Sequence, residues 1–138
     1  MKTFIDTNVL VYAHDTDAGA RHATAKALLA ELWDNRNGSL STQVLQELYV
    51  AVTRKLAKPL SPSDAAAVVG DLSALEVVIV DVPLMQRAIA SSQTHHLSLW
   101  DALIVESARA SGAERLVTEY LPAGRRFGRL RVENPFET

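Results

Sequence analysis

The sequence predicts an α/β domain in which a short parallel sheet is covered by helices on both faces. Segments with strand character alternate with helical segments from the start of the chain to its end, and this alternation is typical of parallel sheets. One segment, VVIVDV at 77–82, is an almost continuous β-branched run, as expected for a buried parallel strand. The length of 138 residues and the apolar share of 48% fit a single domain over residues 1–138.

The first half of the chain is expected to hold two strands and four helices. A short apolar segment predicts the first strand, and Ala- and Leu-rich composition predicts the second helix, which the turn DNRNGS ends. Apolar residues at helical spacing predict the third helix, and Ser61 followed by Pro62 marks the start of the fourth. The expected elements are a strand at 2–5, helices at 8–13 and 20–33, a short strand at 39–41, a helix at 43–57 and a helix beginning at 61–64.

The second half is expected to hold three strands and two helices. Pro83 is well placed to open a helix, and Gly112 is well placed to end one. The expected elements are a strand at 77–82, a helix from Pro83 to about Ser92, a helix at 98–111, a strand at 115–118 and a last strand at 130–132.

Composition excludes several classes of protein. The chain has no cysteine, so neither a disulfide framework nor a thiolate metal site is possible. No apolar run approaches the roughly 20 residues of a membrane span, and the N-terminus reaches Asp6 too early for a signal peptide. We therefore expect no membrane contact and a cytoplasmic location. The net charge of −2 gives no general argument for nucleic acid, although four arginines gather at 125–131 without an intervening acid.

Asp6, in the stretch FIDTNVL, is the first of three acids with unusual neighbours. It follows Phe4 and Ile5 at the expected end of the first strand, and ligands of open α/β sheets bind at that edge. It is equally well placed to cap the helix that follows. Both interpretations of Asp6 remain open from this residue alone.

Glu47 and Asp101 are the other two. Glu47 lies in QVLQELYVAV, where it either belongs to a site or pairs with Arg54 on the helix surface. Asp101 lies in LSLWDALIV among apolar neighbours, where a carboxylate is costly unless it is paired, protonated or bound to metal. Ser98 and Asp101 also have the spacing of a capping box. The spacing explains why an acid stands there, but not its apolar surroundings.

Taken together, the three acids indicate a metal site. Three carboxylates that converge at one sheet edge need a counter-charge, and no basic residue stands beside Asp6 or Asp101 in the sequence. A hard divalent cation, Mg²⁺ or Mn²⁺, takes oxygen ligands and would supply that charge. Such a cluster activates water and stabilises the leaving oxygen in phosphodiester cleavage.

Four segments in order carry a resemblance to a known family. FIDTNVLVY, STQVLQELYVAVTRK, HHLSLWDALIVESA and RLVTEYLPAG together resemble the PIN-domain family, in particular the VapC-type toxins of bacterial toxin–antitoxin systems. The similarity runs from residue 3 to about 136. It implies a PIN-like three-layer α/β/α sandwich. It also implies a Mg²⁺- or Mn²⁺-dependent endoribonuclease that is often a homodimer and that a cognate antitoxin inhibits.

The resemblance also assigns residues. Asp6, Glu47 and Asp101 match the three family acids, with Asp6 and Asp101 as principal metal ligands and Glu47 as a ligand or a contact through water. The implied reaction is hydrolysis of RNA by water activated at the metal. Thr7 and Asn8 match positions expected to steady Asp6.

One position departs from the family pattern. Similar chains have an acid or Asn where this chain has Tyr120, and that position commonly supplies a fourth polar group. Glu119 is the candidate replacement, although a shift of one residue just past a strand points a side chain the other way. The departure leaves a second possibility, a nuclease-dead PIN-like module that binds antitoxin or RNA without cleavage.

Three further hypotheses concern partners and chemistry. The arginines at 125–131 are candidates for contact with RNA phosphates, and the Ala-rich helices around 23–30 and 65–75 are candidates for an antitoxin groove. Core packing and a solvated loop explain the same residues equally well. Phosphotransfer through an aspartyl-phosphate at Asp6 ranks last, because haloacid-dehalogenase-like enzymes place a second Asp where this chain has Asn8.

Overall fold

A computed structural model describes residues 1–137 and shows a six-stranded sheet in the order β3-β2-β1-β4-β6-β5. All neighbouring strands are parallel except β5, which runs antiparallel to β6. The strands are β1 (Thr3–Ile5), β2 (Gly38–Ser41), β3 (Glu76–Val78), β4 (Arg115–Val117), β5 (Arg126–Phe127) and β6 (Leu130–Glu133). The mainly parallel sheet confirms the predicted fold class.

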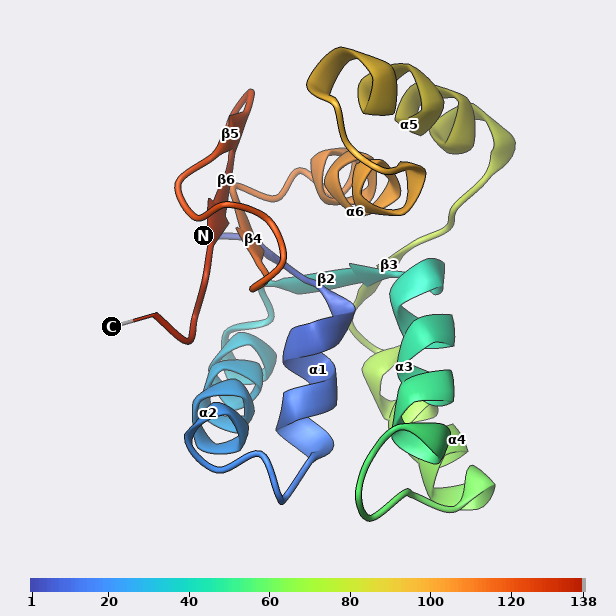
Figure 1. Cartoon of the computed structure of the whole chain (residues 1–138), viewed down its shortest axis with the longest axis vertical. Coiled ribbons are helices and arrows are strands. Elements are labelled where there is room, and N and C mark those ends of the chain that lie inside the picture. Colours follow the sequence, from blue (N-terminus) through green and yellow to red (C-terminus); the bar gives the residue numbers. More distant parts are fainter. Residues whose placement is uncertain (138) are drawn as a thin grey trace.

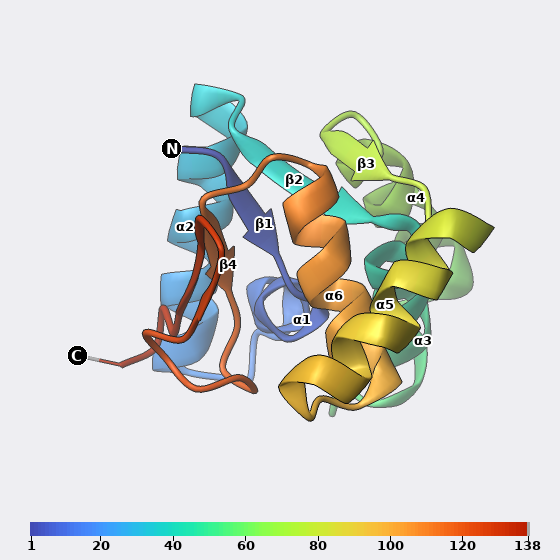
Figure 2. The same cartoon turned by 90° about the horizontal axis from the view of Figure 1, so that it is seen from above.

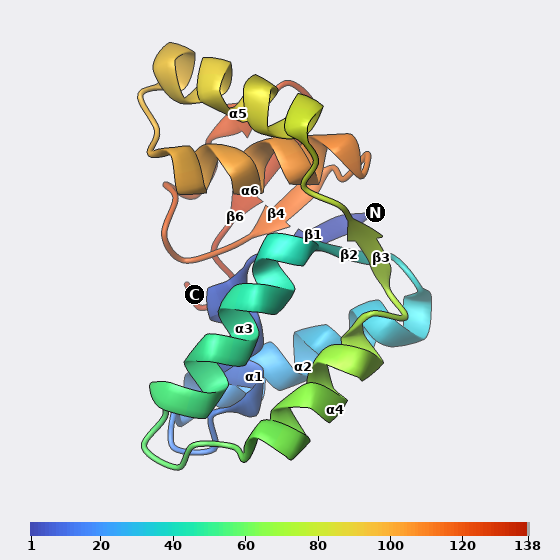
Figure 3. The ribbon, with the colours of Figure 1, turned by 90° about the vertical axis from the view of Figure 1, so that its right-hand side faces the viewer.

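Helices cover both faces of the sheet, which gives three layers (Figures 1 and 3). Four helices, α1 to α4, lie on one face, and α5 and α6 pack together on the other. The helices are α1 (Thr7–His14), α2 (Ala20–Asn35), α3 (Thr42–Arg54), α4 (Pro62–Leu72), α5 (Val82–His95) and α6 (Leu99–Ala110). The predicted three-layer α/β/α sandwich is therefore confirmed. Within residues 1–137 no helix is long and apolar enough to span a membrane.

Two helix starts lie where side-chain caps predicted them. Ser61 accepts a hydrogen bond from the backbone N–H of Asp64, and Pro62 occupies the first turn of α4. Ser98 caps α6 in the same way, by accepting from the N–H of Asp101 at 3.1 Å. The third helix ends at Arg54 rather than at residue 57, because Lys55 closes its last turn.

The segment VVIVDV was predicted to be a buried parallel strand; its strand is parallel to β2 but is not buried. Only Glu76–Val78 form a strand, and β3 lies at the edge of the sheet. Ile79 is 69% exposed and Val82 is 60% exposed. A β-branched run fits an exposed edge strand and the loop after it as well as it fits a core strand, so composition alone misplaced this segment.

The chain also contains a strand that was not predicted. β5 and β6 form a hairpin at the other edge of the sheet, around Gly128 with a φ of 65°. For this region the sequence predicted only the strand at 130–132, and the arginines were left open between an RNA contact and a solvated loop. In the structure Phe127 and Leu130 are buried while Arg126 and Arg131 are exposed, which is the alternation of a half-buried hairpin.

The central strand β1 positions the site. Phe4 and Ile5 are fully buried between the helical layers, and the register pairs Ile5 with Val117 of β4. The next residues, Asp6 and Thr118, therefore leave the sheet side by side at its carboxyl edge. Figure 2 shows α1 continuing directly from the end of β1 under α6.

Candidate active site

Asp6 lies at the carboxyl end of β1 and also caps α1. Its side chain is only 8% exposed, and its Oδ1 accepts a hydrogen bond from the N–H of Thr7 at 2.7 Å. Its own N–H donates to the carbonyl of Val117 at 3.1 Å. The two interpretations of Asp6 are therefore compatible, because the capping contact fixes a buried carboxylate at the sheet edge where sites form.

Thr118 holds the other oxygen of this carboxylate. Its Oγ1 donates to Asp6 Oδ2 at 2.9 Å and accepts from Asn8 Nδ2 at 3.0 Å and from the N–H of Tyr120 at 3.2 Å. Asn8 Oδ1 in turn accepts from the N–H of Glu119 at 3.2 Å. The network binds the ends of β1 and β4 together. Sequence reasoning missed Thr118, because a threonine after a strand gives no signal until the strand register is known.

Glu47 comes from the second turn of α3, and Asp101 comes from the first turn of α6. The two helix starts meet, since Gln43 Nε2 donates to the carbonyl of Trp100 at 3.5 Å. Glu47 is exposed and Asp101 is half-buried. Within residues 1–137 no ion pair joins Glu47 to Arg54, so the simple surface pairing considered for Glu47 is absent from this structure.

The three carboxylates interact electrostatically. The pKa of Asp6 is raised from 3.8 to about 6, mainly by burial and also by the negative charges of Glu47 and Asp101. The hydrogen bonds from Thr118 and Thr7 act in the opposite direction. A buried carboxylate with two acidic neighbours is an environment that favours a bound cation.

The oxygen donors fit a hard divalent cation. Asp6, Glu47 and Asp101 offer only carboxylate oxygens, which Mg²⁺ and Mn²⁺ prefer. The buried hydroxyl of Thr7 has no hydrogen-bond partner in this structure, so a polar group beside Asp6 is left for a ligand or water. In the arrangement of residues 1–137, no three acidic or histidine side chains lie close enough together to hold a metal ion.

The side chain of Glu119 contacts residues of α1 and α2. Its two carboxylate oxygens accept from Tyr12 Oη at 2.7 Å and from Arg21 Nε at 3.3 Å, and its side chain is 14% exposed. The hydrogen bond to this carboxylate is the main cause that raises the pKa of Tyr12 to about 12. Glu119 thus belongs to a network with Tyr12 and Arg21 rather than to the group of three acids.

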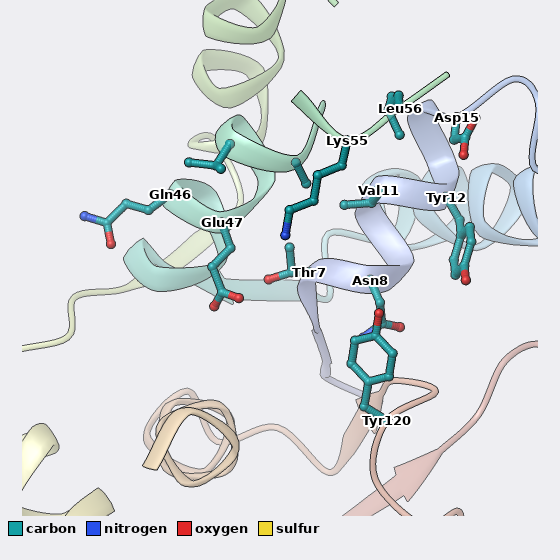
Figure 4. Close-up of a pocket in the computed structure, with 12 residues that line it drawn as sticks. Thr7, Asn8, Val11, Tyr12, Asp15, Gln46, Glu47, Lys55, Leu56 and Tyr120 are labelled. Atoms are coloured by element: carbon teal, nitrogen blue, oxygen red, sulfur yellow. The ribbon is translucent and has the colours of Figure 1, made fainter. Parts of the chain in front are cut away.

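A cavity of about 550 Å³ opens between α1 and α3 beside the acids. Figure 4 shows Glu47 and Lys55 on one side of it, Thr7 and Asn8 on another, and Tyr120 pointing up toward Asn8. Tyr120 is 70% exposed. The cavity is lined by Thr7, Asn8, Val11, Tyr12, Asp15, Gln46, Glu47, Val50, Ala51, Lys55, Leu56 and Tyr120. Lys55 was not singled out from the sequence, because Arg54 was the basic residue expected to face Glu47.

The arginines of the C-terminal region divide between two faces. Arg115, Arg131 and Arg126 are paired across β4, β6 and β5, so they form a row on one face of the sheet. Arg125 instead donates to the carbonyl of His95 at 2.9 Å and lies over the ring of Phe127. Three of the four arginines at 125–131 are exposed.

The Ala-rich helices border a second, larger cavity. It measures about 860 Å³ and lies against α2, α4 and the end of α1. Its apolar wall includes Leu29, Trp33 and Val68, and Trp33 is 43% exposed. The segments proposed for an antitoxin groove therefore do border a hollow rather than packing wholly into the core.

Comparisons with known proteins agree with this geometry. The family model of the PIN domain matches residues 3–120, whereas no curated protein is significantly similar to the chain. Among solved structures, a chain of a toxin–antitoxin complex from Klebsiella pneumoniae is 23% identical with a TM-score of 0.72, covering 99% of this chain and 100% of that one.

Two further structures have the same fold. Mycobacterium tuberculosis VapC20, described as a toxin that cleaves the sarcin-ricin loop, is 22% identical with a TM-score of 0.64, over 83% of this chain and 87% of that one. A chain of VapBC2 from Rickettsia felis, bound to a promoter DNA fragment, is 24% identical with a TM-score of 0.65, over 97% and 98%.

Proposed function

Since the chain belongs to the PIN-domain family, we propose that it is a VapC-type toxin, an endoribonuclease that hydrolyses RNA phosphodiester bonds with Mg²⁺ or Mn²⁺. The observation that carries the proposal is the environment of Asp6. A carboxylate that is 8% exposed and has Glu47 and Asp101 as acidic neighbours is costly for the fold. A divalent cation would offset that cost, and with the cation bound the site could accept the phosphate of an RNA strand.

Each acid has a separate role in this proposal. Asp6 is the fixed ligand, because Thr7 and Thr118 hold both of its oxygens. Asp101 and the more exposed Glu47 complete the site by rotation of their side chains. When bound, the cation lowers the pKa of a water molecule and offsets negative charge on the phosphate. The protein contributes an oriented Asp6 and a cavity that admits the RNA strand next to it.

Glu119 is proposed as a supporting residue rather than a ligand. Its carboxylate binds Tyr12 and Arg21, and its N–H is held by Asn8, so it fixes the loop after β4. Thr118, which contacts Asp6, lies at the start of the same loop. Glu119 therefore acts on catalysis through the position of Thr118.

We further propose the partners that the family suggests. The similar solved structures include a toxin–antitoxin complex and a VapBC complex, so a cognate antitoxin is the expected inhibitor. The cavity bordered by α2 and α4 is a candidate place for it. A homodimer and a cytoplasmic location are expected on the same grounds. The row formed by Arg115, Arg131 and Arg126 is a candidate contact for RNA phosphates.

The test is RNA cleavage by purified protein that is free of antitoxin. Total bacterial RNA is incubated with Mg²⁺, Mn²⁺ or EDTA, and the new ends are mapped by sequencing. We expect cleavage at a small number of positions with either metal, none with EDTA, and none with Asp6→Asn. Cleavage that persists in EDTA or in Asp6→Asn would contradict the proposal.

One observation favours a second function, a PIN-like module that binds antitoxin or RNA without cutting. Tyr120 replaces the fourth polar group of the family, and Glu119 is engaged elsewhere. This alternative predicts Mg²⁺ binding that is weak or absent by calorimetry, and no cleavage of total RNA by the native chain. Cleavage that appears only in Tyr120→Asp would establish it.

A further inference from the structure

We propose that Lys55 binds a phosphate of the RNA backbone next to the three acids, in the cavity between α1 and α3. This inference rests on the ribonuclease function proposed above, since it names a substrate contact of the same cavity. The cavity carries few charged side chains. Among residues 1–137, the lining carries the acids Asp15 and Glu47, and Lys55 is its one cationic side chain.

Helix geometry explains how Lys55 reaches the acids. Glu47, Ala51 and Lys55 follow one another at intervals of four residues, so they share a face of α3. The Cα atoms of Glu47 and Lys55 are about 12 Å apart along the helix axis. Helical side chains lean toward the N-terminus, and Lys55 keeps a nearly helical backbone as the C-cap. Its long side chain therefore extends back over the cavity toward Glu47 and Thr7, as Figure 4 shows.

The ammonium group of Lys55 is not used by the fold. In the described part of the chain, Lys55 Nζ has no hydrogen-bond or ion-pair partner within the protein, whereas Lys58, three residues on, pairs with Asp17 at 3.6 Å. Lys2 is similarly occupied, since its Nζ donates to the carbonyl of Ser111 at 2.8 Å. A lysine that extends into a cavity without a protein partner has its positive charge free for a ligand.

The rest of the cavity suits a nucleotide. Thr7, which follows Asp6 in the chain, lines the cavity, and its buried hydroxyl has no hydrogen-bond partner in the described part of the protein. Val11, Val50 and Leu56 give an apolar wall for a ribose or a base. An anionic group next to three carboxylates needs a compensating cation, and Lys55, whose side chain extends toward Glu47 and Thr7 (Figure 4), supplies it.

The first experiment measures binding without cleavage. A fluorescein-labelled single-stranded RNA of random sequence is titrated in EDTA at several salt concentrations, and anisotropy gives Kd. One phosphate contact contributes about 0.7 to the slope of log K against log salt for single strands. We expect Lys55→Gln to reduce the slope by about this amount, and Lys55→Arg to restore it.

Lys58→Gln is the matched control. It removes the same charge three residues away, from a side chain that is 78% exposed and lies outside the cavity. A general electrostatic effect would change both glutamine variants equally, whereas a phosphate contact changes only Lys55→Gln. Equal slopes for the two variants, or no binding of RNA by the native chain, would overturn the proposal.

Cleavage kinetics separate this inference from the proposed function. With Mg²⁺ and a substrate identified from total RNA, Lys55→Gln should raise KM and leave kcat close to its native value, because a backbone contact outside the reacting bond binds the ground state and transition state alike. If the native chain binds RNA through Lys55 but never cuts it, the ribonuclease function fails and the phosphate contact stands. If the native chain cleaves RNA, and Lys55→Gln has the same KM and the same salt dependence of RNA binding as the native chain, only the Lys55 inference fails.

Discussion

At the scale of single residues, Thr118 determines how Asp6 is presented. Its hydroxyl is the only group of the described chain that donates to Asp6 Oδ2 while also accepting from Asn8 Nδ2 and Tyr120 N–H. The hydroxyl therefore stabilises the ionised carboxylate and fixes its direction. Partners of this kind behind metal ligands commonly contribute 10- to 100-fold in affinity or activity, about the range expected here.

Thr118→Val tests this role. Valine keeps the shape but loses the hydrogen bond that lowers the pKa of Asp6, so the pKa of Asp6 should rise above its present value of about 6. We expect Mg²⁺ affinity to fall by about tenfold or more and the pH midpoint of Mg²⁺ binding to move upward. Calorimetry across a pH series measures both. If the pH midpoint of Mg²⁺ binding is the same in Thr118→Val as in the native chain, the Thr118 hydroxyl does not act on Asp6.

Tyr120 is the second residue with a definite prediction. It is 70% exposed and points into the cavity beside Asn8, so the fold should tolerate substitution within about 0.5 kcal/mol. Tyr120→Asp places a carboxylate where the family has its fourth polar group. We expect the Mg²⁺ concentration for half-maximal cleavage to fall by about tenfold.

Tyr120→Phe is the control for this substitution. It keeps the ring and adds no charge, so its metal requirement should equal that of the native chain. If Tyr120→Asp behaves like Tyr120→Phe, then Glu119 or water already fulfils the fourth role.

Two of the proposed site acids, Asp6 and Asp101, could be singled out from the sequence because charge is conspicuous in apolar surroundings. Asp6 and Asp101 are flanked by residues that belong in a core, and their chemistry is visible without a structure. Thr118 and Lys55 could not be predicted in this way. Their importance depends on the pairing of β1 with β4 and on the lean of side chains along α3, and neither is written in the local sequence.

At the scale of elements, each acid is placed by the start of a helix. Asp6 precedes α1, Glu47 lies early in α3, and Asp101 lies in the first turn of α6. The Ser98 cap accepts from the N–H of Asp101 itself. The cap therefore links the stability of α6 to the position of a proposed metal ligand.

Ser98→Ala separates the two effects when it is compared with Ser61→Ala. Both serines accept from the third residue of their helix at 3.1 Å, so each loss should cost about 1 kcal/mol of folding free energy, measured by urea denaturation. Only Ser98→Ala should also weaken Mg²⁺ binding, because only α6 carries Asp101. Equal Mg²⁺ affinities in the two variants would remove the link between cap and site.

The starts of α4 and α6 were predictable because a capping serine acts locally. Ser61 and Ser98 each accept a hydrogen bond from a backbone N–H in the first turn of the helix that follows. The sheet edges were not predictable. β3 was predicted as a buried strand from a β-branched run, yet the order β3-β2-β1-β4-β6-β5 places it at an edge. β5 went unrecognised because its arginines hid the alternation of Phe127 and Leu130. Position within a sheet is decided by pairing with distant strands, which composition does not encode.

At the scale of the whole molecule, the site reduces stability. The folded pKa of Asp6, about 6, lies above its ordinary value of 3.8, so the folded state binds the proton more tightly than the unfolded state does. Stability therefore falls as pH rises from about 4 to about 6 and is constant above that range as far as Asp6 is concerned. Linkage gives an order of magnitude of about 3 kcal/mol for the full effect.

Asp6→Asn should therefore stabilise the metal-free protein at about pH 7.5, by roughly 1 to 3 kcal/mol, and should lose this advantage near pH 4. Asparagine removes the buried charge, although it satisfies Thr7 N–H and Thr118 Oγ1 less well than a carboxylate does, which lowers the gain. Urea denaturation of both proteins in EDTA at the two pH values measures the difference. A variant that is less stable than the native chain at both pH values would mean that ionised Asp6 is not strained.

Bound Mg²⁺ should offset the loss of folding stability that the ionised, buried Asp6 causes in the native chain. A ligand that binds only the folded state stabilises it by RT ln(1 + [L]/Kd), about 2.7 kcal/mol at a hundredfold excess over Kd. We expect Mg²⁺ to raise the Tm of the native protein at about pH 7.5 and to have a much smaller effect near pH 5, where a proton on Asp6 competes with it. Asp6→Asn should show no Mg²⁺-dependent shift at either pH. If Mg²⁺ raises the Tm of Asp6→Asn as much as it raises that of the native chain, the cation binds elsewhere. If the Mg²⁺-dependent rise of the native Tm is the same at both pH values, Asp6 does not release a proton when the metal binds.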